Sequence, residues 1–151
     1  MSFKNIFTAI CLSGFSAISF GQASPVSLDF QLLNKGPTSK EMKIEGTNES
    51  VFLEQASLTI KDVVSAKLTD PSCTSSCMIG IKFSEEGAKK LSQLTRTHLN
   101  QKMGIVLNGK LLSAPTIKAE ISGGEAQISG QFDRNSANGI IENINKATGK
   151  I

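Results

Sequence analysis

Residues 103–132 constrain the fold most, because they contain extended segments separated by two strong turn signals. Alternating apolar residues lead to the Asn-Gly pair at 108–109, the dipeptide that most readily adopts the two positive φ angles of a type I′ hairpin turn. The Gly-Gly pair at 123–124 marks a second reversal, and apolar and polar residues alternate again over 126–131. Pro115 has no N–H to donate, so the middle strand is expected to be interrupted or at an edge there. These residues therefore predict a three-stranded β-meander.

The composition indicates a single domain and argues against a nucleic-acid partner. The chain has 151 residues, enough for one domain with a substantial core. It contains eight Phe and no Trp or Tyr, which argues against a surface of exposed rings for stacking nucleic-acid bases. The net charge of +3 comes from sixteen basic and thirteen acidic residues without a basic block. We therefore expect no nucleic-acid partner.

Residues 1–23 have the pattern of a secretory signal peptide. Lys4 supplies the positive charge, residues 6–20 are apolar, and Gly21 and Ala23 are the small residues at −3 and −1. Cleavage is expected between Ala23 and Ser24, with the mature chain outside the cytoplasm. A retained membrane anchor is less favoured, because the apolar run is short and rich in Ser and Gly. Lipid attachment at Cys11 is less favoured still.

The mature chain would keep two cysteines, Cys73 and Cys77, in a turn-rich segment. In an oxidising compartment, a pair this close is expected to form a disulfide. A metal site lacks ligands, because His98 is the only histidine. A catalytic redox pair usually has two residues between its cysteines, and this pair has three.

The remaining pattern predicts strands and two helices. Strands are expected over 26–32, around 42–44, and over 51–53, 62–68 and 78–83, although 62–68 fits a helical turn as well. We choose a strand there, because a hairpin closed by the disulfide then connects it simply to 78–83. Ser84 is a good N-cap for a helix to about residue 99, and Asp133 can cap a second helix ending near Gly149.

Helices with one apolar stripe and strands with one apolar face predict an α+β protein. We expect a two-layer sandwich, with a mostly antiparallel sheet and both helices packed on one face. Residues 24–50 would form an N-terminal strand and a variable loop, and residues 51–151 the main α+β domain.

Several short motifs occur in order along the chain: FSEEGA at 83–88, LT at 94–95, IVLNG at 105–109, SAP at 113–115, ISGG at 121–124 and ISGQF at 128–132. In order and spacing, they resemble the head portion of the first periplasmic domain of SecD, the membrane subunit that assists the bacterial preprotein translocase. The resemblance covers about residues 51–144. The sequence departs from the family pattern at His98, Asn100, Gly104 and Ser136.

The resemblance implies an α+β head that contacts translocating or unfolded polypeptide on the periplasmic side of the membrane. No further apolar run follows residue 23, so we expect no transmembrane segment in the mature chain and no intramembrane carboxylate. The chain is thus expected to be a freestanding, secreted head domain and not a proton-driven motor.

The residue types and motifs of the sequence give little support for an enzyme active site. His98 would have to serve any Ser-His-Asp hydrolase, but it lies on or near the apolar side of a helix and no G-x-S-x-G motif is present. Glu85 and Glu86 are explained by the helix dipole, and the turn glycines do not lead into a helix that could form a phosphate site. We expect no enzyme activity and no cofactor.

The leading hypothesis is a periplasmic polypeptide-binding module, accessory to protein export or chaperone-like. An extended peptide could pair with a strand edge or lie on the sheet face that the helices leave bare. The alternative is an inhibitor or immunity-type protein that binds one folded partner through loop 34–50 or the Cys73–Cys77 turn. A hydrolase of low specificity is the third possibility.

Overall fold

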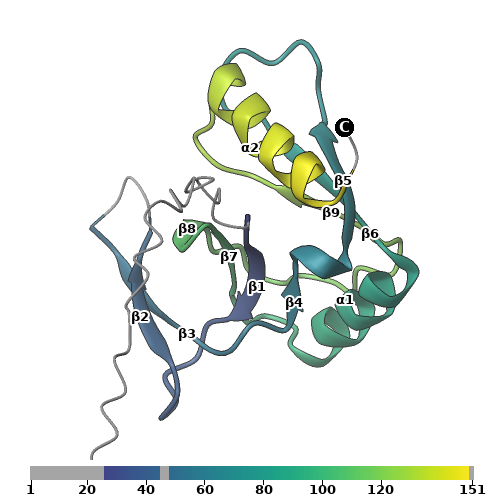
Figure 1. Ribbon diagram of the computed structural model, residues 1–151. Coiled ribbons are helices and arrows are strands. Elements are labelled where there is room, and N and C mark those ends of the chain that lie inside the picture. The colour runs from purple at the N-terminus through teal and green to yellow at the C-terminus, as the bar shows by residue number, and fades with distance from the viewer. Residues whose placement is uncertain (1–25, 45–47, 150–151) are drawn as a thin grey trace, which may run out of the picture.

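The computed structural model describes residues 26–44 and 48–149. Within these ranges the chain forms the following elements, labelled in Figure 1: strands β1 (Leu28–Leu32), β2 (Lys40–Lys43), β3 (Ser50–Leu53), β4 (Leu58–Thr59), β5 (Val63–Leu68), β6 (Ile79–Phe83), β7 (Met103–Leu107), β8 (Lys110–Ser113) and β9 (Glu125–Ile128), helices α1 (Glu85–Thr97) and α2 (Arg134–Ala147), and a 3₁₀ turn η1 (Ile60–Asp62). Every strand pair in the described sheets is antiparallel. The α+β class is confirmed.

The four-stranded sheet, in the order β4-β1-β7-β8, is covered on both faces. One face supplies Leu28 and Phe30 of β1 and Ile105 of β7 to the main core. Val106 on the opposite face packs with Leu53 of the β2–β3 hairpin in a second cluster. Central strand β7 is consequently buried at all five positions, which explains why its sequence is almost uniformly apolar.

The three-stranded sheet, in the order β5-β6-β9, has one buried and one bare face. Ile79, Ile81 and Ile128 point into the main core, where α2 packs along β5 (Figure 1). The residues between them alternate to the other face. Lys67, Lys82, Glu125 and Gln127 are exposed there. The expected bare sheet face is therefore present in this sheet, and it is polar.

The expected single sheet and three-stranded meander are wrong. Only β7 and β8 form the predicted hairpin, with positive φ at Asn108 and Gly109, and β9 pairs with β6 in the other sheet. After Pro115 the chain follows residues 100–103: the Ile117 N–H donates to the Gln101 carbonyl at 2.8 Å, and Thr116 forms only an isolated bridge to Lys102. The middle strand of the expected meander consequently ends at Ser113 and does not continue after Pro115.

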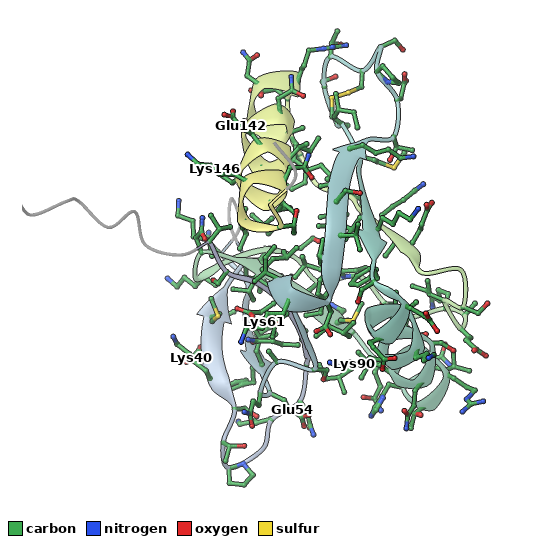
Figure 2. All side chains as sticks on the ribbon, turned by 45° about the vertical axis from the view of Figure 1, so that its right-hand side comes forward. Lys40, Glu54, Lys61, Lys90, Glu142 and Lys146 are labelled. Carbon is green, nitrogen blue, oxygen red and sulfur yellow. A yellow bond between two sulfur atoms is a disulfide. The ribbon has the colours of Figure 1, made fainter. Side chains whose placement is uncertain are left out.

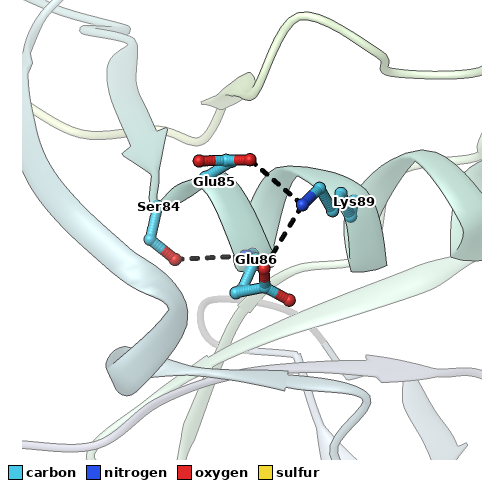
Figure 3. Close-up of polar contacts among 5 residues, drawn as sticks. Ser84, Glu85, Glu86 and Lys89 are labelled. Atoms are coloured by element: carbon cyan, nitrogen blue, oxygen red, sulfur yellow. Dashed lines mark hydrogen bonds and ion pairs between the residues drawn. The ribbon is translucent and has the colours of Figure 1, made fainter.

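The predicted helix starts are confirmed. The Ser84 side chain accepts a hydrogen bond from the Gly87 N–H at 3.1 Å at the start of α1, and Asp133 caps α2 through the Ser136 N–H at 2.7 Å. Lys89 lies 3.0 Å from Glu85 and 3.3 Å from Glu86 (Figure 3). All three side chains are mostly exposed, so these ion pairs add little to stability.

The β5–β6 hairpin ends in the turn that contains Cys73 and Cys77, and a disulfide joins the two residues. Arg134 at the start of α2 donates through Nε to the Cys73 carbonyl at 2.9 Å and through Nη2 to the Pro71 carbonyl. The Cys77 N–H donates to the Phe132 carbonyl at 2.8 Å. The disulfide turn is thereby fastened to the segment that leads into α2. The expected signal peptide and its cleavage site at Ala23 and Ser24 lie outside the described residues.

Candidate polypeptide-binding edge

The two outer edges of the three-stranded sheet differ. At the β5 edge, the side chain of Asn145 in α2 binds the backbone of Ala66: the Ala66 N–H donates to Oδ1 at 2.7 Å, and Nδ2 donates to the Ala66 carbonyl at 3.0 Å. These are the positions that a further strand would use. The β5 edge is thus closed by a side chain at Ala66.

The β9 edge has no such cover. The Phe83 N–H donates to the Gly124 carbonyl at 2.9 Å, which places this pair in hydrogen-bonding register. Bonded and non-bonded pairs alternate along antiparallel strands, so Ala126 and Ile128 bond to β6 while Glu125 and Gln127 direct their backbone groups outward. No hydrogen bond from the described part of the chain reaches these outward groups. They can therefore accept a further strand.

An apolar hollow of about 280 Å³ lies beside this edge. One wall is β9, with Ala126 and Ile128, and the other is the segment 115–121, with Ile117 and Ile121. Met103 of β7 lies at its inner end, among residues of the main core. The side chains of a bound strand that face inward could bury their apolar surface in this hollow.

A second, larger hollow has a volume of about 780 Å³. It lies between Leu112 and Ala114 on one side and Phe132 and Ile140 on the other. The two hollows share no lining residue, but their linings are neighbours in the chain, at Ala114 and Pro115 on one wall and near Ile128 and Gly130 on the other. We call the two hollows together with the outer edge of β9 the β9 cleft.

Among the residues that the structure describes, the charged ones that line these hollows are Lys110 and Lys118. Asp29 and Asp62, two carboxylates with shifted pKa values, line neither hollow. Burial raises the pKa of Asp29, which lies in a hollow beside the β2–β3 hairpin. Burial would also raise the pKa of Asp62, but hydrogen bonds from Lys90 and Thr59 and the Lys90 charge outweigh it and lower that pKa.

The other residues singled out by the sequence do not meet at one site. His98 ends α1, where its Nδ1 lies 2.9 Å from the Leu94 carbonyl oxygen. Glu85 and Glu86 pair with Lys89 on the exposed side of the same helix. Among the residues that the structure describes, no group of three His, Cys, Asp or Glu side chains could hold a metal ion.

Sequence reasoning identified a strand edge near Pro115 but missed the strand that provides it. Pro115 belongs to the far wall of the cleft, and the open edge is that of β9. The alternation of exposed Glu125 and Gln127 with inward Ala126 and Ile128 was visible in the sequence. The pairing of β9 with β6 could not be predicted from the sequence, because no short-range signal connects strands more than 40 residues apart.

Comparison with known proteins agrees with this architecture. The family model described as "SecDF, P1 head subdomain" matches residues 37–146, most of the chain. The chain belongs to the SecDF P1 head family. A protein translocase subunit SecD from Sebaldella termitidis is 44% identical over 70 residues, covering 46% of this chain and 17% of that protein. The SecD subunit of Leptotrichia buccalis is 29% identical over 113 residues, covering 75% and 24% respectively. This SecDF head chain thus spans a quarter or less of these relatives.

Solved structures show the same fold. A structure described as "a membrane component SecDF that enhances protein export" superposes with a TM-score of 0.64 at 23% identity, covering 80% of this chain and 62% of that one. A crystal structure of SecDF in a super-membrane-facing form gives a TM-score of 0.65 at 23% identity, covering 80% of this chain and 18% of that one. Within the described ranges of this SecDF head chain, neither helix has the length and apolar character needed to cross a bilayer.

Proposed function

We propose that this SecDF P1 head protein is a non-enzymatic module that binds unfolded or extended polypeptide in the periplasm, as an accessory to protein export or as a chaperone-like factor. The observation that carries the proposal is the unpaired outer edge of β9, which opens onto an apolar cleft. Residues 1–23 would direct export, with cleavage between Ala23 and Ser24.

Strand addition to β9 matches the chemistry of unfolded chains. A peptide paired with Glu125 and Gln127 would use only its backbone groups, which every sequence offers. Each such hydrogen bond adds about 0.5–1.5 kcal/mol net, so side chains buried in the cleft must supply the remaining affinity. Weak binding to many segments is the expected result, and it suits transient contact with a passing polypeptide.

Family membership supports the same proposal. The relatives that match this chain are protein translocase SecD subunits, and one solved relative is described as enhancing protein export. The β9 cleft gives that family role a physical basis in this chain, because it combines backbone pairing with apolar burial at one site.

Hydrogen exchange followed by NMR tests the binding mode. The probe is lactalbumin that has been reduced and carbamidomethylated, which has no stable fold. We expect added probe to slow exchange of the Glu125 and Gln127 amides and to leave that of Ala126, already bonded to β6, little changed. The proposal is overturned if the probe binds and protects neither outward amide, or if it does not bind.

A proline at position 127 gives a second test. Gln127→Pro removes an outward N–H and leaves the bonds of Ala126 and Ile128 to β6 in place, as edge strands permit. Gln127→Ala is the matched control, because it changes the side chain and keeps the donor. We expect the proline variant to lose at least about half of the probe affinity and the alanine variant to retain it.

A pull-down from periplasmic extract separates this role from that of an inhibitor or immunity-type protein. A diffuse set of exported proteins, displaced by the unfolded probe, would support the proposal. One folded partner retained in stoichiometric amount, through loop 34–50 or the disulfide turn, would contradict it.

A further inference from the structure

We propose that the β9 edge recognises two apolar side chains separated by one residue in an extended polypeptide, the spacing i and i+2. This inference rests on the proposed function and adds the sequence pattern that the cleft prefers.

The two sides of the β9 edge differ in character. Towards the main core lies the apolar hollow of about 280 Å³, which Ala126 and Ile128 of β9 line together with Phe30 and Ile105. On the opposite face of the sheet is a hollow of about 580 Å³, and most of its lining is polar: Ser65, Lys67, Thr69, Lys82, Glu125 and Gln127. Figure 2 shows side chains that end in nitrogen or oxygen on this face, away from α2. A strand added to β9 would therefore have an apolar surface on one side and a polar surface on the other.

Backbone pairing determines which side chains of a bound strand face the apolar hollow. Directly opposed residues of neighbouring strands point to the same face of a sheet. The residues opposite Ala126 and Ile128 therefore face the hollow, and the residue between them lies opposite Gln127 on the polar face. Because Ala126 and Ile128 are two residues apart, about 7 Å along the strand, their partners in the peptide have the same spacing.

Odd spacings place the apolar pair differently. With apolar residues at i and i+1, or at i and i+3, one side chain faces the hollow and the other lies on the polar face. There it remains in water beside Lys82 and Glu125, which are directly opposed on β6 and β9. The odd spacings therefore bury one apolar side chain fewer.

The size of the effect follows from that one side chain. Complete burial of an aliphatic side chain corresponds to about tenfold or more in affinity. The hollow is partly open to solvent, so burial in it is incomplete. We therefore expect the i and i+2 spacing to improve affinity at least about threefold.

Three peptides of identical composition provide the experiment. Each carries two leucines in a background of Ser, Thr and Gln, placed at i and i+1, at i and i+2, or at i and i+3, and has blocked termini. Titration into the purified, isotope-labelled chain is followed by NMR, with the Glu125 and Gln127 amides as reporters. We expect the i and i+2 peptide to bind at least about threefold more tightly than either isomer.

Reduced, carbamidomethylated lactalbumin, titrated in parallel, separates the two proposals. If neither lactalbumin nor any peptide binds, the proposed function is overturned. If lactalbumin binds and the three peptides bind equally or not at all, only the present inference is overturned. Tightest binding of the i and i+3 peptide, the spacing that places two side chains on one face of a helix, would overturn it as well.

Filling the apolar hollow from β9 tests the side-chain site. Ala126→Ile adds an aliphatic side chain beside Ile128 and leaves the outward backbone groups of Glu125 and Gln127 in place. We expect the advantage of the i and i+2 peptide to disappear, because one of its two side-chain positions is then occupied.

Thr69→Ile is the matched control, because Thr69 is exposed and lines the polar hollow but not the apolar one. Thermal unfolding establishes that both variants are folded, and the ranking of the three peptides on the unmodified chain stands without either variant. An advantage that persists in folded Ala126→Ile, or that Thr69→Ile abolishes equally, would contradict the inference.

Discussion

Asn145 of α2 binds both backbone groups of Ala66 that point away from the sheet, at 2.7 Å and 3.0 Å. One side-chain amide thereby takes the place of a neighbouring strand at the β5 edge. Exposed strand edges invite pairing with other chains, and proteins commonly block them. In the three-stranded sheet the β5 edge is blocked at Ala66, which leaves β9 as the edge that the proposed peptide could join.

Replacing this amide should destabilise the fold. Asn145→Ala leaves the Ala66 N–H and carbonyl without partners at a partly buried site, and we expect the free energy of unfolding to fall by about 1–3 kcal/mol. Urea unfolding measures the change. Asn143→Ala is the control, because Asn143 is exposed on the same helix and the intrinsic helix preference changes equally. An equal effect of both variants would show that the Ala66 contact contributes nothing.

Two helical glycines should respond to alanine in opposite directions. A Cβ at Gly87 in α1 would overlap the Asp62 carbonyl oxygen, which is backbone and cannot move aside, whereas a Cβ at Gly139 in α2 meets no atom within 4 Å. Gly87→Ala should therefore cost about 1–3 kcal/mol. Gly139→Ala should add up to about 1 kcal/mol through helix preference. Thermal unfolding of the two variants checks both signs, and a stabilised Gly87→Ala protein would contradict the close packing of α1 on η1.

Local signals predicted the local structure well. The Asn-Gly pair at 108–109 takes the expected positive φ angles, and Ser84 and Asp133 cap the two helices. Each of these features depends on residues within four positions of one another. The α+β class followed, because periodicity alone identifies most of the strands and both helices.

Long-range pairing could not be predicted in the same way. The sheet divides because residues 115–117 hydrogen-bond to 101–103 and because Gly124, at φ +68°, turns the chain towards β6. The Asn145 contact to Ala66 joins residues 79 positions apart. An asparagine on a helix gives no sign of such a partner, so the difference between the closed β5 edge and the open β9 edge emerged only from the structure.

The ion pair between buried Asp62 and exposed Lys90 should make the stability of the fold depend on pH in the acidic range. Lys90 Nζ lies 2.7 Å from Asp62 Oδ1, and the Thr59 N–H donates to Oδ2 at 2.9 Å. These contacts outweigh the effect of burial and lower the pKa of Asp62 in the folded protein. Because this pKa is lowered on folding, Asp62 stabilises the fold at pH values above its pKa in the unfolded chain, about 3.9. The contribution is lost as the pH falls through the pKa of Asp62 in the folded protein.

Asp62→Asn tests this dependence. We expect it to cost about 1 kcal/mol at pH 7, a modest value because the Lys90 side chain is 56% exposed. The difference from the unmodified chain should shrink below about pH 4. Urea unfolding at pH 7, 5, 4 and 3 measures it, with Glu85→Gln as an exposed control. A difference that stays constant down to pH 3 would rule out the charge of Asp62 as the cause.

The disulfide turn should stabilise both the hairpin and the wall of the larger hollow. Closing a loop of this length, with a sequence separation of four, is worth about 2 kcal/mol by chain entropy. Reduction should lower the free energy of unfolding by that amount and should speed amide exchange at Cys77, whose N–H binds the Phe132 carbonyl. The double variant Cys73→Ala/Cys77→Ala should show the same loss and no response to reductant. If reductant destabilises the double variant as much as the unmodified chain, the effect does not arise from this disulfide.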